Sequence, residues 1–227
     1  MRIKNIVATS IFIICIITIS LLTSGGCDID FGGGGGDDGG NLVSIVQGTI
    51  SPPDNSGITV VLSNNGNLPF FESGPTGDSG DFFITGDFNG CLTLRLEFQD
   101  SNQDVIAFTN VTVFPEANVD LGDISLENGN VILEDANNIT VNFDGNINFT
   151  PPTLNTCSGG VNTSEGTLVI TRGNTDVTVQ IDPSLTNIED KNNNPIGCDD
   201  LIDDDEVDVA GFLQVNDTVL ATTLSLK

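Results

Sequence analysis

Short alternating runs of apolar and polar residues follow one another from residue 43 to the end of the chain. In the run 92–98, leucine and phenylalanine take every second position, and Thr93, Arg95 and Glu97 fall between them. That period of two is typical of a strand buried on one face. Clusters of Gly, Asn, Asp and Pro separate the runs, and no window keeps a helical period. The pattern predicts strands over 43–50, 58–62, 82–84, 92–98, 105–108, 111–114, 119–126, 139–143, 147–149, 168–171, 177–181, 207–215 and 219–226.

Turn residues predict where hairpins close in the second half of the chain. Tight β-turns need Gly, Asn or Asp at positions with a positive φ. Three short segments have this chemistry: Asp144-Gly145, Arg172-Gly173-Asn174 and Val215-Asn216-Asp217. Together, the strands and turns predict an all-β chain.

The first 27 residues follow a different pattern. Arg2 and Lys4 precede the 17-residue, largely apolar run 6–22, and 23–27 reads Thr-Ser-Gly-Gly-Cys. A basic start, an apolar run and small residues are the parts of an export signal. A cysteine directly after two glycines resembles a bacterial lipoprotein signal, which implies that Cys27 is lipidated and becomes the mature N-terminus. The alternative is an uncleaved anchor, since the run is just shorter than the roughly 20 residues that span a bilayer.

Composition excludes several kinds of chemistry. The chain has no His, Trp or Tyr and 13 Phe, so a Ser-His-Asp or Cys-His pair and an imidazole metal site are excluded. A paired-carboxylate mechanism stays formally open because it needs only Asp or Glu. The 32 acidic residues outnumber six basic ones, so the chain repels nucleic acid and anionic headgroups. We expect no enzymatic activity, no nucleic-acid partner, and membrane contact through the N-terminal lipid.

Composition also divides the chain. We expect a signal peptide over 1–26 and a Gly/Asp-rich flexible tether over 27–42, where glycine without apolar cover does not repay the entropy of ordering. A first domain is expected over 43–128 and a second over 129–227.

The first domain contains a series of short motifs. In order they are Val46-x-Gly48-x-Ile50, Ile58-x-Val60-x-Leu62, Thr76-x-Asp78-x-Gly80-x-Phe82-x-Ile84, Gly90-x-Leu92-x-Leu94 and Val119-x-Leu121-Gly122-x-Ile124-x-Leu126. The series resembles a carboxypeptidase regulatory-like domain, a transthyretin-like or starch-binding-like accessory module of secreted bacterial proteins. The resemblance implies a Greek-key β-sandwich without catalytic residues.

The second domain resembles a small oligonucleotide-binding-like β-barrel of unassigned function found in exported bacterial proteins. The resemblance rests on Gly166-Thr167-Leu168-Val169-Ile170, on 177–190, on Asp205-Glu206-Val207-x-Val209-x-Gly211 and on Val219-Leu220-Ala221. It implies a second small β-barrel after the sandwich. The net charge excludes the nucleic-acid ligand that the fold name suggests.

Three cysteines remain after the signal and Cys27. Cys157 and Cys198 belong to the same domain in an oxidising compartment, so we expect a disulfide between them, worth about 4 kcal/mol on the chain-entropy model. Cys91 is then unpaired.

Acidic clusters raise the question of calcium. The run 199–208 holds seven carboxylates, and Asp199, Asp203 and Asp205 are the candidate Ca²⁺ ligands in it. The run becomes a strand at Val207, which sends alternate side chains to opposite faces, so we expect weak binding or none, and no required cofactor. Two loops with partial calcium spacing, Asp100-x-Asn102-x-Asp104 and Asp190-x-Asn192-x-Asn194, lack Gly at the sixth position and Glu at the twelfth, and are interpreted as turns.

The sequence therefore favours a non-enzymatic, extracytoplasmic surface lipoprotein with a structural or adhesive role, at the outer membrane or cell surface, with a protein or glycan partner. The alternative is a small ligand-binding module of an exported bacterial system, either carbohydrate-binding or calcium-dependent. Glycan recognition uses flat aromatic side chains, so exposure of Phe70 and Phe71 would favour carbohydrate and their burial would count against it.

Overall fold

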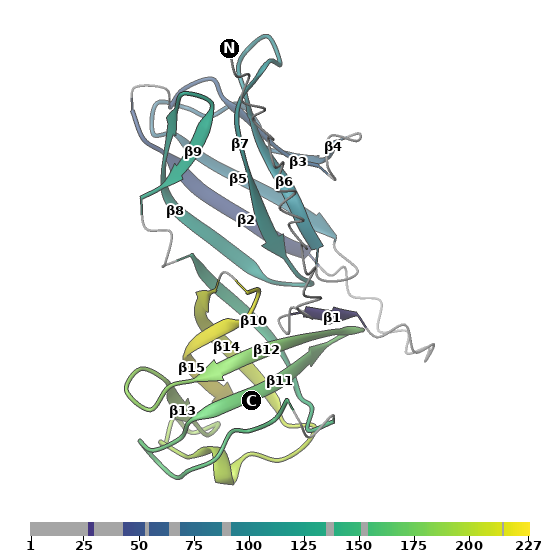
Figure 1. Cartoon of the computed structure of the whole chain (residues 1–227), viewed down its shortest axis with the longest axis vertical. Coiled ribbons are helices and arrows are strands. Elements are labelled where there is room, and N and C mark those ends of the chain that lie inside the picture. The colour runs from purple at the N-terminus through teal and green to yellow at the C-terminus, as the bar shows by residue number, and fades with distance from the viewer. Residues whose placement is uncertain are drawn as a thin grey trace, which may run out of the picture.

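The computed structural model describes residues 27–29, 43–52, 55–63, 69–87, 92–134, 139–150, 154–214 and 216–227. The expected signal peptide and most of the expected tether lie outside these residues. The described chain is all-β, and its one helical segment is a single 3₁₀ turn, η1 (Cys198–Asp200). Figure 1 shows two strand-rich lobes, which we call the sandwich and the barrel.

The sandwich consists of two sheets that pack face to face. The first sheet has the order β5 (Asp81–Asp87), β2 (Val43–Ile50), β8 (Asn118–Glu127). The second has the order β4 (Pro69–Glu72), β3 (Thr59–Ser63), β6 (Leu92–Gln99), β7 (Val105–Val113). Leu94, Leu96 and Phe98 are buried as their alternation predicts, and Phe98 meets Phe82 of the first sheet edge to face at 5.9 Å.

The barrel is a closed ring of five strands. Going round it, each strand pairs with the next: β10 (Thr140–Ile147), β14 (Glu206–Leu213), β15 (Val219–Leu226), β12 (Thr175–Ile181), β11 (Gly166–Arg172) and again β10. Two short strands pair with this ring, β13 (Asn187–Glu189) with β15 and β1 (Cys27–Ile29) with β12. Inward-pointing valine, isoleucine and leucine side chains fill the centre.

One predicted turn is wrong. Asp144 and Gly145 lie inside β10, which runs without a break to Ile147. A Cβ at Gly145 would stand 2.7 Å from both the Ile170 side chain and the Thr171 carbonyl oxygen. The glycine is therefore needed where β10 approaches β11 to close the barrel. The other two turns are where they were predicted, between β11 and β12 and between β14 and β15, although Val215 itself is outside the described residues.

The sandwich also extends further along the chain than its expected end at residue 128. β9 (Asn130–Leu133) folds back antiparallel on β8, and one of its residues, Asn130, pairs with Phe108 of β7. The predicted runs 105–108 and 111–114 form the single strand β7, and 139–143 with 147–149 correspond to β10.

The two lobes are joined by backbone pairing and by packing. Asn118 to Asp120 of β8 pair with Thr140 to Asn142 of β10, so one sheet continues from the sandwich into the barrel. The ring of Phe114, just after β7, meets Phe143 of β10 edge to face at 5.2 Å and 83°. Because both rings belong to one hydrophobic cluster that includes residues of both lobes, the lobes share a core.

Candidate functional site

The expected lipidation site lies at the start of the described chain. The backbone of Cys27 belongs to β1, opposite Val177 of β12. Its side chain, the expected export signal over 1–26 and Cys91 lie outside what the structure describes. Among the described residues, no helix is long and apolar enough to cross a membrane.

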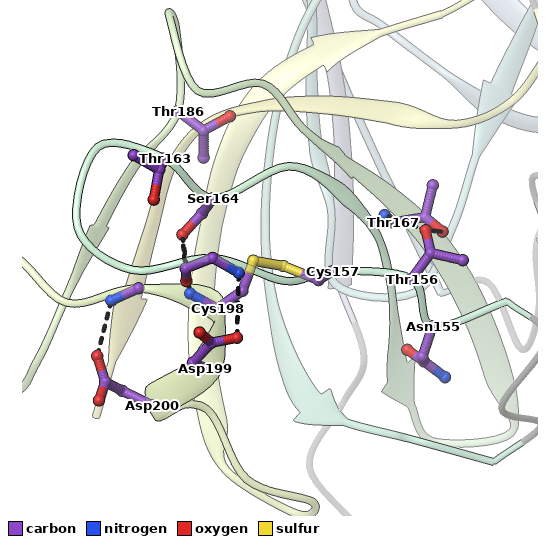
Figure 2. The surroundings of a disulfide bond; sticks show 12 residues. Asn155, Thr156, Cys157, Thr163, Ser164, Thr167, Thr186, Cys198, Asp199 and Asp200 are labelled. Carbon is purple, nitrogen blue, oxygen red and sulfur yellow. Dashed lines mark hydrogen bonds between the residues drawn. A yellow bond between two sulfur atoms is a disulfide. The ribbon is translucent and has the colours of Figure 1, made fainter.

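Cys157 and Cys198 form a disulfide with Cα atoms 5.6 Å apart, the pairing expected from the sequence. Hydrogen bonds hold the two segments in place around it (Figure 2). The Cys198 N–H donates to Ser164 Oγ at 2.8 Å, and the Gly159 N–H donates to an Asp199 carboxylate oxygen at 3.0 Å. The disulfide and its neighbours therefore fasten the loop before β11 to the segment around η1.

The candidate calcium ligands each serve a different backbone segment. Asp199 accepts from Gly159, Asp203 accepts from the Phe149 N–H at 2.8 Å, and Asp205 accepts from the Ile202 N–H at 2.9 Å. No three His, Cys, Asp or Glu side chains within the described ranges form a group that could hold a metal ion. The acidic run thus shapes the loop that leads into β14.

The two loops with partial calcium spacing are tight turns of the same kind. Asp100 accepts the N–H groups of Asn102 and Asp104, and Asp190 accepts those of Asn192 and Asn194, all at 2.8–3.0 Å. Hydrogen bonds from the Asn194 side chain and backbone hold the pKa of Asp190 down to about 2. In each loop the aspartate carboxylate organises the turn, as the sequence predicted.

A second feature, which the motifs did not indicate, is one face of the continuous sheet. The order β5–β2–β8–β10–β14–β15 runs across both lobes. Paired residues point to the same side of a sheet. One side contributes core residues such as Val46, Val119 and Val141. We call the opposite, outward side of these six strands the long face.

The register of the long face places its side chains in rows. One row runs Phe83, Gln47, Asp120, Thr140, Phe212 across β5, β2, β8, β10 and β14. A phenylalanine therefore stands on β5 and another on β14, with an amide, a carboxylate and a hydroxyl between them, and the row continues to Leu220 of β15. Phe83 is 53% exposed, and Phe212 is partly exposed.

The long face carries a depression on each lobe. The depression on the sandwich, of about 340 Å³, is lined by residues that include Gln47, Thr49, Asp81, Phe83 and Asp120. The depression on the barrel, of about 320 Å³, is lined by residues that include Asn142, Asp144, Asp208, Thr223 and Ser225. Both hollows present amide, carboxylate or hydroxyl side chains beside apolar surface, a combination that suits a ligand with both hydroxyl groups and C–H faces.

Hydrogen bonds fix the polar side chains of the sandwich depression. The Gln47 amide donates to Asp120 Oδ2 and the Thr49 hydroxyl donates to Asp81 Oδ1, both at 2.9 Å. The other Asp120 oxygen accepts the Gly122 N–H at 2.9 Å. Because these groups are held before any ligand arrives, binding would lose less side-chain entropy.

The barrel end of the long face has one cation surrounded by acids. Lys227 Nζ lies 3.0 Å from Asp144, 3.0 Å from Asp208 and 3.2 Å from Glu206. Burial alone would lower the pKa of Lys227, but its hydrogen bonds to the three carboxylates raise it above its usual value. The lysine is neutralised by its neighbours, so the long face keeps an acidic character.

The aromatic side chains named in the sequence analysis do not belong to this face. Phe71 of β4 is partly buried against the core, which counts against carbohydrate binding at that position, and the side chain of Phe70 is outside the described residues. Phe83 was missed, although the alternation 81–85 did place it opposite the buried Phe82 and Ile84. What the sequence could not supply was the strand register that aligns Phe83 with Gln47 and Asp120.

Comparison with models of protein families, with curated proteins and with solved structures found no match to this chain.

Proposed function

We propose that this chain is a non-enzymatic surface lipoprotein of a bacterium, anchored through Cys27, and that it acts in adhesion through the long face. In this proposal the sandwich is a carboxypeptidase regulatory-like module and the barrel is an oligonucleotide-binding-like module that carries no nucleic acid. The N-terminal pattern supports the anchor. The observation that carries adhesion is the polar, pre-organised face that runs without a break over six strands.

The joint between the lobes supports an adhesive role in a second way. An adhesin transmits force between its anchor and its partner, which requires that its parts do not separate under load. Backbone pairing between β8 and β10 and the contact of Phe114 with Phe143 bind the lobes to one another. The disulfide adds a covalent closure within the barrel. The long face would therefore remain continuous while the protein is pulled.

The composition is also consistent with exposure to the medium. The chain carries a formal net charge of −26, which keeps it soluble and away from anionic headgroups. Without histidine, the usual nucleophile and base pairs are excluded, so we place the function in binding.

The anchor and the adhesive role are tested together in cells that express the full chain. Metabolic labelling with an alkyne fatty acid should label the wild type and leave the Cys27→Ser variant unlabelled, because only the thiol carries the lipid thioether. Wild-type cells should be retained more strongly than Cys27→Ser cells on at least one of three coats: a neutral polysaccharide, gelatin or alginate. Equal labelling of both proteins would refute the anchor, and equal retention on every coat would refute adhesion.

A further inference from the structure

The first row of the long face has a length and a composition that point to a particular ligand. Phe83 and Phe212 are separated by four inter-strand steps of about 4.8 Å, or roughly 19 Å. This span exceeds a single sugar ring or any other compact small molecule. Gln47, Asp120 and Thr140 occupy the strands between the two rings. A ligand that used the whole row would be an extended polymer crossing the strands.

We propose that the long face binds an extended, uncharged polysaccharide that lies across the strands from Phe83 to Phe212. This inference rests on the proposed adhesive function and names the class of its ligand. Phenylalanine rings offer flat apolar surfaces for the C–H faces of sugar rings, and the amide, carboxylate and hydroxyl between them match sugar hydroxyl groups, which donate and accept.

The charge of the face decides between neutral and anionic polymers. Asp81, Asp120 and Asp144 all line the two depressions, and Lys227 is already paired with three carboxylates. An anionic polysaccharide would therefore meet repulsion from Asp120 on the row and from Asp81 and Asp144 beside it. A neutral polymer meets none, and its binding should change little with salt.

A protein partner fits the face less well. Protein interfaces concentrate their affinity in a desolvated apolar centre surrounded by a polar rim. Here the arrangement is reversed, because the three positions between Phe83 and Phe212 are polar and the aromatic rings flank them. The two depressions are open to solvent along their polar side chains. Such a surface suits a hydrated chain that contacts several shallow positions in succession.

The test is native affinity electrophoresis of the full lipoprotein, purified in a non-ionic detergent. Its strong negative charge gives it high mobility, so binding to a polysaccharide cast in the gel appears as retardation. The neutral panel is amylopectin, mixed-linkage β-glucan, xyloglucan and galactomannan, and the anionic panel is alginate and polygalacturonate. We expect retardation by at least one neutral polymer, none by the anionic polymers, and the same retardation when sodium chloride is raised.

Three substitutions locate the site. Phe83→Ala and Phe212→Ala should each weaken binding by about tenfold, the scale of losing one stacked ring. The matched control is Phe108→Ala, because Phe108 is 50% exposed, close to the 53% of Phe83, but lies on β7 in the other sheet. The control should bind as the wild type does. If Phe212→Ala lowers the melting temperature, its effect on binding cannot be separated from an effect on folding. Gln47→Ala, a second substitution on the row, should then also weaken binding.

Several results would overturn the inference: no neutral polymer retards the wild type, anionic polymers retard it equally, or Phe108→Ala weakens binding as much as Phe83→Ala does. If cells still adhere to gelatin in a Phe83-dependent manner while no polysaccharide retards the protein, the polysaccharide is wrong and the adhesive function stands. If neither adhesion nor retardation occurs, both are wrong.

Discussion

The joint between the lobes gives a quantitative prediction, because the side chain of Phe114 packs in the core that the sandwich and the barrel share. Phe114 is 1% exposed, and its ring meets Phe143 of the barrel edge to face. Its carbonyl oxygen accepts the Ser44 hydroxyl at 2.8 Å, which fixes the turn before β8. We therefore expect Phe114→Ala to weaken the sandwich and the barrel together.

The magnitude follows from burial. Replacing a fully buried phenylalanine by alanine costs about 3–5 kcal/mol, of which the aromatic pair accounts for about 0.5–1.5 kcal/mol. For a chain of this size, each kcal/mol lowers the melting temperature by about 2–4 °C, so the expected decrease is about 6–20 °C. A double-mutant cycle with Phe143→Leu should recover the smaller, pairwise part.

The assay is thermal unfolding followed by circular dichroism and calorimetry, because the chain has no Trp or Tyr for intrinsic fluorescence. We expect one cooperative transition in the wild type that moves as a whole in Phe114→Ala. Phe83→Ala, which replaces an exposed phenylalanine of the sandwich, is the control and should change stability by no more than about 0.5 kcal/mol. Two transitions, of which only one moves, would refute the shared core.

Three further predictions concern the barrel and its loops. Replacing both Cys157 and Cys198 by serine should lower the free energy of unfolding by about 4 kcal/mol on the chain-entropy model. Peptide mapping of the wild type without reductant should recover the two cysteines in one linked peptide. A linked peptide that contains Cys91 would contradict the pairing. Because the pKa of Asp190 is lowered, the stability that its carboxylate provides is present above about pH 4 and is lost as the pH falls towards about 2. The Asp190→Asn variant should therefore be less stable than the wild type at pH 7. In acid denaturation curves the difference between the two proteins should shrink. Millimolar calcium should raise the melting temperature no more than sodium at equal ionic strength, and a larger gain that disappears in Asp203→Asn with Asp205→Asn would show a real site.

The sequence predicted most of the strands because alternation is a local property. β2 and β15 begin and end where the apolar runs do, and the buried positions of β6 follow the pattern of every second residue. The short strands β4 and β9 were not predicted, because four residues contain too few repeats of the alternation to be recognised. Their stability comes from the strands with which they pair.

The error at Asp144-Gly145 has the same origin. Glycine is required both in a tight turn and where two backbones come close, and the local sequence is similar in the two cases. Only the position of Ile170 and Thr171, which lie far along the chain, distinguishes them. The long face depends even more on distant residues, because its rows exist only once six strands have taken their register.

The few basic residues show how an acidic chain holds this arrangement together. Arg172, at the end of β11, pairs with Asp144 of the barrel at 3.0 Å and also with Glu116, which lies in the turn between β7 and β8 of the sandwich. Lys227 pairs with the same Oδ2 atom of Asp144 at 3.0 Å. Isolated pairs this close to solvent contribute little to stability, about 0–1 kcal/mol each. Their importance lies in position: without them, carboxylates from both lobes would face one another at the joint, and repulsion would act where β8 and β10 must pair. Arg172 and Lys227 are thus placed where the continuity of the long face would otherwise be opposed by charge.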